Sequence, residues 1–228
     1  MPKLILFDID GTLIASGGAG VRAMSLALAE LYGVEDGLKD VAVAGRMDTG
    51  IIREALTKHG IPSEPFPELV ETFRNVYFRH LAHTLPEATG GRVLPGIRGM
   101  LAALQQRSDV RLSLATGNFR RGAELKLTYH GLWHFFDGGA FAEDCEQRTE
   151  LITAAKRRLL DGSRGEESPV YVIGDTILDI EAARAGDAIA VAVATGLSDG
   201  VETLQAAGPD FVFPDFADWR AVLQTLGL

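Results

Sequence analysis

Short, almost continuously apolar segments alternate with longer segments of helical periodicity along most of this 228-residue chain. Strands that are buried on both faces have such uninterrupted apolar sequences, and helices between them allow the strands to pair in parallel. The alternation therefore predicts an α/β fold built on a doubly wound parallel sheet. The expected strands cover residues 4–7, 110–115, 170–173, 188–193 and 211–213.

Apolar residues recur at helical spacing in the stretches between and after the later strands. The expected helices there cover residues 119–129, 149–160, 178–185, 201–207 and 216–226.

Residues 17–91 break this rhythm, because they hold three helical patterns and no convincing strand between them. Three apolar stripes can bury one another in a small bundle. Glycines at both ends of the segment, in residues 17–20 and 90–91, would give it flexible connections. We therefore expect a Rossmann-like core domain formed by residues 1–16 and 92–228, and a small all-helical cap domain formed by residues 17–91, inserted after the first strand.

The charge balance and the cysteine content limit the partners and the compartment. The chain has 22 lysines and arginines against 31 aspartates and glutamates, a net charge of −9. This balance works against nucleic acid or an anionic membrane as a partner. The single cysteine, Cys145, cannot form an internal disulfide, and no apolar run is long enough for a signal peptide or a spanning helix. These features predict a cytoplasmic protein.

Two carboxylates follow the first expected strand, in the segment Asp8-Ile9-Asp10-Gly11-Thr12. In extended chain, side chains two residues apart project to the same side, within about 7 Å of each other. Like charges at the end of an apolar strand repel unless a cation or a shared proton relieves them. The pair therefore indicates a metal site or two catalytic carboxyl groups; the alternative is a solvated turn after a strand.

A second acidic segment, Gly174-Asp175-Thr176-Ile177-Leu178-Asp179, also follows an expected strand. If a helix begins near Thr176, Asp175 and Asp179 lie on neighbouring turns and face one side. The alternative is an acidic helix N-terminus, where aspartate is favoured by the helix dipole.

A third polar segment, Thr116-Gly117-Asn118, lies between an expected strand and an expected helix. A hydroxyl group and free backbone N–H groups at a helix N-terminus can bind phosphate. The same sequence is also typical of an ordinary N-cap. Because ligands bind at the carboxyl ends of parallel strands, we expect all three polar segments to meet at one site.

Taken together, these segments resemble the haloacid dehalogenase superfamily. Its phosphatase members have Asp-x-Asp-Gly-Thr, a strand-ending Thr or Ser, a basic residue and Gly-Asp-x-x-x-Asp in this order. The resemblance covers nearly the whole chain, and the helical insertion is similar to the small mobile cap of the family. It implies Mg²⁺ as the cofactor and phosphoryl transfer through an aspartyl-phosphate.

The resemblance also implies roles for individual residues. Asp8 would be the nucleophile, and Asp10 would protonate the leaving oxygen and later activate water. Mg²⁺ would be bound by Asp8, the backbone carbonyl of Asp10 and Asp175, with support from Asp179. Thr116 would hold phosphate oxygens with the Gly117 N–H. The residues expected to bind substrate are Gly11, Thr12, Gly117, Asn118 and Arg46.

The basic residue of the family is usually a lysine in a Lys-Pro pair, which this sequence lacks. Arg148 lies at a similar distance before Asp175 and would hold a phosphate oxygen and brace Asp8; the alternative is a surface arginine beside Glu146 and Glu150. Lys126 lies about two turns into its expected helix, roughly 10 Å from the phosphate end. This distance predicts a solvated or packing lysine.

The segment Gly45-Arg46-Met47-Asp48 resembles the specificity loop of similar phosphatases. Arg46 would then meet a substrate carboxylate. The alternative is that Asp48 caps a helix beginning near Thr49 while Arg46 lies in solvent.

The sequence thus predicts a Mg²⁺-dependent phosphomonoester hydrolase that acts on a small phosphorylated metabolite, with phosphoglycolate as one expected substrate. Two alternatives stay open, a sugar phosphomutase on the same core and a non-catalytic binding or regulatory protein. A carbon–halogen hydrolase is less favoured, because haloacid dehalogenases have no general acid at the Asp10 position. We expect a monomer or a homodimer.

Overall fold

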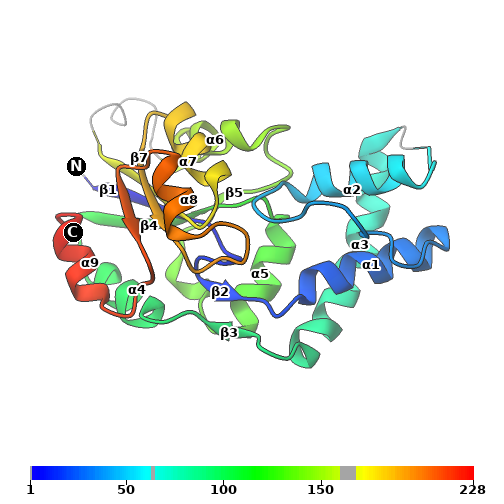
Figure 1. Ribbon diagram of the computed structural model, residues 1–228, viewed down its shortest axis with the longest axis horizontal. Coiled ribbons are helices and arrows are strands. Elements are labelled where there is room, and N and C mark those ends of the chain that lie inside the picture. Colours follow the sequence, from blue (N-terminus) through cyan, green and yellow to red (C-terminus); the bar gives the residue numbers. More distant parts are fainter. Residues whose placement is uncertain (1, 63–64, 160–167) are drawn as a thin grey trace.

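The computed structural model describes residues 2–62, 65–159 and 168–228. In this part of the chain, six strands form one parallel sheet in the order β5-β4-β1-β6-β7-β8 (Figure 1). The strand order changes direction at β1, which pairs with β4 on one side and β6 on the other. Ligands bind at such switch points, beyond the carboxyl ends of the strands. The strands are β1 (Lys3–Phe7), β4 (Val110–Ala115), β5 (Gly139–Ala140), β6 (Val170–Gly174), β7 (Ile189–Val193) and β8 (Phe211–Phe213).

Helices cover both faces of the sheet, as the apolar sequence of the strands requires. Along β1, Leu4 and Leu6 face one side, while Ile5 and Phe7 face the other. The first pair packs with residues of α6 (Leu151–Leu159), α7 (Ile177–Ala185) and α8 (Val201–Ala206). The second pair packs with α4 (Ile97–Gln105), α5 (Arg120–Tyr129) and α9 (Trp219–Thr225). This two-sided burial confirms the predicted doubly wound α/β fold.

Three consecutive helices, α1 (Ala19–Tyr32), α2 (Asp48–Lys58) and α3 (Phe66–Glu87), lie together on the right of Figure 1, away from α4 and α9. We call them the cap helices. The chain leaves the core through β2 (Ile14–Ala15) and returns through β3 (Arg92–Val93), and these two short strands pair in antiparallel fashion. Their position next to residues 17 and 91 agrees with the expected boundaries, but the division into two domains stays a prediction.

The cap helices are amphipathic. In α3 the buried residues include Phe73, Tyr77 and Leu81, which recur every four residues on one face.

Among the described residues, no helix has an apolar stretch long enough to cross a lipid bilayer.

Most predicted elements are confirmed within one to three residues. The helix expected at residues 149–160 begins as a short 3₁₀ turn, Arg148–Glu150, and continues as α6; residue 160 lies outside the described residues. The sequence analysis did not predict α4, β5, β2 or β3. The three missed strands have two residues each, too few for periodicity, whereas α4 has a clear apolar stripe of Ile97, Met100, Leu101 and Leu104.

Leu6 tests how much the central strand contributes to stability. It is fully buried between β4 and β6, so Leu6→Ala should lower the free energy of unfolding by about 2–5 kcal/mol. Leu26→Ala is the matched control, because this leucine of α1 is 38 % exposed; its loss should stay below about 1 kcal/mol. Chemical denaturation measures both, and equal losses would contradict the assignment of β1 to the core.

Candidate active site

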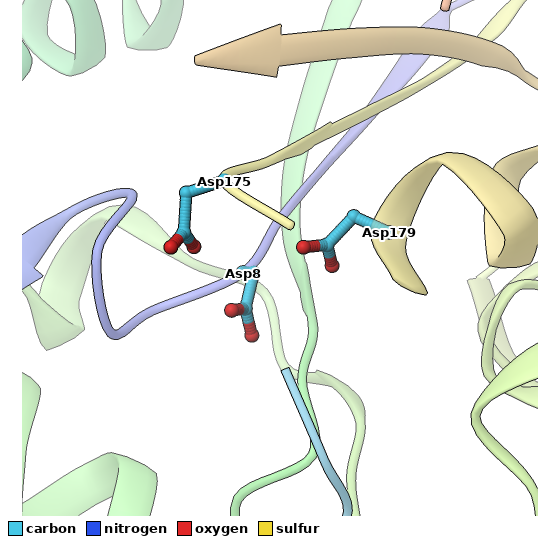
Figure 2. Close-up of side chains that lie close together, drawn as sticks. All are labelled: Asp8, Asp175 and Asp179. Atoms are coloured by element: carbon cyan, nitrogen blue, oxygen red, sulfur yellow. The ribbon is translucent and has the colours of Figure 1, made fainter. Parts of the chain in front are cut away.

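Three carboxylates lie close together where β1 and β6 end (Figure 2). Asp8 follows β1, Asp175 follows β6, and Asp179 lies in the first turn of α7. One oxygen from each lies within 4.8 Å of the others, and all three side chains are buried. Neighbouring parallel strands end at the same edge of the sheet, which brings together residues far apart in the sequence. The predicted convergence of these aspartates is present in the structure.

Small residues and one hydroxyl group hold Asp175 in place. Gly11 has a left-handed backbone (φ = 84°), and a Cβ atom there or at Gly196 would collide with the Asp175 carboxylate. The Thr12 hydroxyl donates a hydrogen bond to Asp175 Oδ1 at 3.0 Å. Thr12 was predicted to bind substrate, but it is fully buried and positions Asp175 instead. Thr195, whose hydroxyl donates to the Gly11 carbonyl at 2.6 Å, was not predicted.

Asp179 and Thr176 form a capping box at the start of α7. Asp179 Oδ2 accepts hydrogen bonds from the Thr176 N–H at 3.1 Å and the Thr176 hydroxyl at 2.7 Å. Asp175 precedes this cap and is not helical, so the predicted neighbouring turns are wrong, but the two carboxylates face the same cluster as expected. The alternative prediction, that these aspartates belong to an acidic helix N-terminus, is confirmed for Asp179 only.

Arg148 contacts two carboxylates of the cluster. Its Nη2 atom is 2.5 Å from Asp179 Oδ1 and 3.4 Å from Asp8 Oδ1. The side chain is buried, and a capping box between Gln147 and Glu150 fixes the turn from which it projects. The alternative of a surface arginine is therefore wrong. Its contact with Asp8 agrees with the predicted bracing role.

The cluster holds more negative charge than Arg148 neutralises. Burial raises the pKa of Asp8 to about 6, with a further increase from Asp179, while Arg148 and a hydrogen bond with Thr116 lower it. Burial, together with Asp179 and Asp8, raises the pKa of Asp175 to about 9. Such shifts indicate that the ionised cluster needs a further cation.

Asp10 has different partners from Asp8. Its Oδ2 atom lies 2.5 Å from Lys126 Nζ and 3.0 Å from Asn118 Nδ2. Desolvation alone would raise the pKa of Asp10, but Lys126 and the hydrogen bonds outweigh it and hold this pKa below its usual range. The two carboxyl groups of the Asp-x-Asp segment are therefore electrostatically distinct.

Lys126 is not a solvated lysine, and this sequence prediction is wrong. The side chain is buried, and Nζ also donates to Asn118 Oδ1 at 2.6 Å. The sequence analysis placed Lys126 too far from the start of its helix to reach the site. Side chains in a helix lean toward its N-terminus, however, and the long lysine side chain spans this distance.

The start of α5 is capped by carboxylates from elsewhere in the chain. Asp48 Oδ2 accepts from the Phe119 N–H at 2.8 Å, and the Glu143 carboxylate accepts from the Arg120 N–H. The N-cap interpretation of Thr116-Gly117-Asn118 is therefore wrong. Thr116 is fully buried beside Asp8 and accepts from Asn118 Nδ2 at 2.9 Å. Gly117 and Asn118 line the cavity described below.

The loop before α2 joins the cap helices to the core. The Asp48 N–H donates to the Gly117 carbonyl at 2.7 Å, and a Cβ atom at Gly117 would collide with the Arg46 carbonyl. Asp48 is the first residue of α2, and its side chain does not cap this helix. The alternative that Asp48 is a helix cap is therefore wrong. Arg46 is not free in solvent either, because its Nη1 atom contacts Glu54 Oε2 at 2.5 Å.

A cavity of about 460 Å³ opens between the cap helices and the strand ends. It contains Asp8, Asp10 and Asp175 on the core side, and Arg46 and Tyr77 on the cap side. The volume suits a small molecule. Tyr77 was not singled out in the sequence, although it lies four residues after Phe73 on the buried face of α3. The whole arrangement is a buried acidic cluster, with compensating cations, that faces a partly open cavity.

Comparisons with known proteins find relatives in sequence and in fold. A family model described as haloacid dehalogenase-like hydrolase matches residues 2–187, which confirms the predicted resemblance. The chain is 29 % identical to a phosphoglycolate phosphatase from Rhodospirillum rubrum, over 100 % of this chain and 94 % of that protein. It is also 29 % identical to a phosphoglycolate phosphatase from Pseudomonas savastanoi, over 88 % and 72 % of the two chains. A haloacid dehalogenase-like hydrolase from Streptococcus pneumoniae shares the fold, with a TM-score of 0.68 at 21 % identity and coverage of 98 % and 99 %.

Asp48→Asn should reduce the pH dependence of stability. Burial raises the pKa of Asp48 to about 7, from 3.8 for the free side chain, so the folded state binds its proton more tightly. The resulting stabilisation is lost progressively as the pH rises from the pKa of the free side chain to about 7, so the free energy of unfolding of the metal-free protein should be lower at about pH 8 than at about pH 5. Asparagine at position 48 does not ionise, so the free energy of unfolding of the variant should decrease less over this pH range.

Chemical denaturation at the two pH values measures this difference. The matched control is Asp218→Asn, which alters an exposed carboxylate that caps α9 and should change stability equally at both pH values. Parallel pH profiles for the wild type and the Asp48 variant would contradict the assignment.

Proposed function

The chain belongs to the haloacid dehalogenase-like hydrolase family, and from this premise we propose that it is a Mg²⁺-dependent phosphatase. Its substrate would be a small phosphorylated metabolite, hydrolysed through an aspartyl-phosphate on Asp8. The observation that carries the proposal is Asp8 itself: its Oδ1 atom is buried without a hydrogen-bond partner, at the edge of the cavity and beside a second carboxylate and an arginine.

The donor set fits Mg²⁺. This ion prefers oxygen ligands and is bound in enzymes by one or two carboxylates together with substrate phosphate. Asp8 Oδ1 has no hydrogen-bond partner, and the raised pKa of Asp175 indicates uncompensated negative charge. Asp179 is less suited to direct ligation, since Arg148 and Thr176 engage both of its oxygens. We assign Asp8 and Asp175, with the Asp10 carbonyl, as ligands and Asp179 as their support. When bound, the metal would supply charge compensation for the approaching phosphate.

Asp8 and Asp10 divide the chemistry in this proposal. An Asp8 oxygen attacks phosphorus, and the bond from phosphorus to the ester oxygen breaks as Asp10 donates its proton to that oxygen. Asp10 then accepts a proton from the water that attacks the aspartyl-phosphate, which releases phosphate and regenerates Asp8. Lys126 and Asn118, both in contact with Asp10 Oδ2, would orient its carboxyl group.

Positive charge on the core side would bind the phosphoryl group. Arg148 contacts Asp8 Oδ1 and lines the cavity, so it would stabilise the charge that develops on the phosphoryl oxygens. Thr116 and Gly117, which follow β4, would supply further hydrogen bonds. In this assignment Arg148 takes the place of the lysine found in similar enzymes.

The curated relatives support phosphoglycolate as one substrate to test. Arg46 lines the cavity, as its predicted contact with substrate requires, but its charge is already paired with Glu54. A cytoplasmic location and a monomeric or homodimeric state stay predictions.

Asp8→Asn should abolish phosphatase activity, because it removes the nucleophile while keeping the size of the side chain. We expect kcat for a generic aryl phosphate to fall at least ~10³-fold. Asp137→Asn, which alters an exposed carboxylate paired with Arg111, should leave kcat unchanged. Release of inorganic phosphate measures both. No turnover by the wild type, or equal turnover by the Asp8 variant, would contradict the proposal.

Asp175→Asn should weaken Mg²⁺ binding. Loss of one of two anionic ligands is expected to raise the Kd at least ~10-fold, as measured by titration calorimetry at neutral pH. Chelation of the metal should remove phosphatase activity from the wild type, and added Mg²⁺ should restore it. Undiminished Mg²⁺ binding by the Asp175 variant, with the Asp137 variant as reference, would show that the cluster is not the metal site.

A further inference from the structure

The hydroxyl group of Tyr77 is buried without a hydrogen-bond partner. The ring itself is fully buried and packs against Phe73, Phe78 and Phe119. A buried polar group without a partner costs free energy, typically about 1–3 kcal/mol, unless a ligand or water satisfies it. Tyr77 lines the cavity that contains Asp8 and Asp10. The uncompensated hydroxyl therefore points to a bound group inside this cavity.

Two glycines border this hydroxyl, and we call the region beside them the recess. A Cβ atom at Gly122 of α5 would lie 3.7 Å from it. A Cβ atom at Gly20 of α1 would lie 3.8 Å from it and 3.3 Å from Lys126 Nζ. Gly20, which lines the cavity, is thus close to two hydrogen-bond donors.

Both groups are available as donors. Burial, with the nearby carboxylates of Asp48 and Asp10, raises the pKa of Tyr77 well above its usual value, so the hydroxyl keeps its proton. An ammonium group has three N–H donors, and Lys126 uses two of them on Asp10 and Asn118. We infer that a substrate oxygen in contact with Gly20 would accept from Tyr77 and from the third N–H of Lys126.

The leaving group of the substrate is the part that would reach this recess. Lys126 Nζ contacts Asp10, the residue to which we assign protonation of the ester oxygen. A group within reach of both Asp10 and Tyr77 therefore lies on the ester side of phosphorus, opposite Asp8. The cavity is also lined by the apolar side chains of Val21, Met24, Val43 and Ile51, and Arg46 and Arg92 line it as further donors. Of these donors, Tyr77 and Lys126 are the two that lie next to Gly20.

We propose that Tyr77 is a specificity residue: its hydroxyl, together with Lys126 Nζ, donates hydrogen bonds to an oxygen acceptor on the leaving group. The preferred substrates are then short phosphomonoesters that carry a carboxylate or hydroxyl oxygen close to the ester carbon. This inference rests on the proposed phosphatase function and adds the class of substrate to it.

The experiment compares three probes of similar size: 2-phosphoglycolate, 2-hydroxyethyl phosphate and ethyl phosphate, which has no second oxygen group. Their kcat/KM values are measured for the wild type, Tyr77→Phe and Gly20→Ala, with Mg²⁺ present. Their Kd values are measured by calorimetry in the Asp8→Asn background with and without Tyr77→Phe, which makes the binding result independent of turnover. Tyr171→Phe is the matched control, because it removes a buried tyrosine hydroxyl that donates to the Leu226 carbonyl far from the cavity.

We expect the wild type to prefer at least one acceptor-bearing ester over ethyl phosphate by at least about tenfold, in both kcat/KM and Kd. Tyr77→Phe should reduce this preference about tenfold, Gly20→Ala should reduce it in the same direction by filling the recess, and Tyr171→Phe should leave it unchanged. An unchanged preference in Tyr77→Phe, or no preference in the wild type, would overturn the inference even if phosphatase activity is present. Absence of turnover with all three esters would instead contradict the proposed function, and the Kd values would still decide the role of Tyr77.

Discussion

The balance of buried charge at the carboxyl ends of β1 and β6 is the constraint on which the rest of this structure depends. Three aspartates are held within a few ångströms of one another, and one arginine contacts two of them. Desolvating several like charges is unfavourable unless cations or hydrogen bonds compensate them. Many features of the surrounding chain serve this compensation: the turn that projects Arg148, the capping box that engages Asp179, and the glycines that allow the backbone to approach Asp175. The remaining imbalance is the physical reason for proposing a divalent cation.

The separation of Asp8 from Asp10 is the second consequence of this charge distribution. The two residues are two positions apart in the sequence. Asp8 faces the carboxylate cluster, whereas Asp10 faces Lys126 and Asn118. Their pKa values are shifted in opposite directions, upward for Asp8 and downward for Asp10. These directions are those of the metal-free cluster, and they run opposite to the proposed roles, because a nucleophile must be ionised and a general acid must carry a proton. The division of roles therefore rests on the different partners of the two carboxyl groups. The free hydroxyl of Tyr77 extends the same site toward the cap helices.

Contact between the cap helices and the core is made through backbone as well as side chains. Gly45 has a left-handed backbone, and a Cβ atom there would press against the Thr176 side chain, while Gly117 meets the carbonyl of Arg46. Asp48 adds a hydrogen bond to the start of α5. Because Thr176 and Gly117 belong to loops that carry the acidic cluster and the Thr116 segment, closure of the cavity and the geometry of the site depend on the same contacts.

The sequence by itself determined the parallel α/β core, the three helices of the insertion and the convergence of Asp8, Asp10, Thr116 and Asp175. Strands buried on both faces need apolar runs, and polar residues after parallel strands meet at one edge, so local patterns suffice for these features. Only the tertiary structure decided which cation each carboxylate contacts. Whether Arg148 and Lys126 point to solvent or to an aspartate depends on long, flexible side chains and on what packs above them. The partners of Asp48 and Tyr77 were equally hidden, because they lie on segments that meet only when the insertion folds over the strand ends.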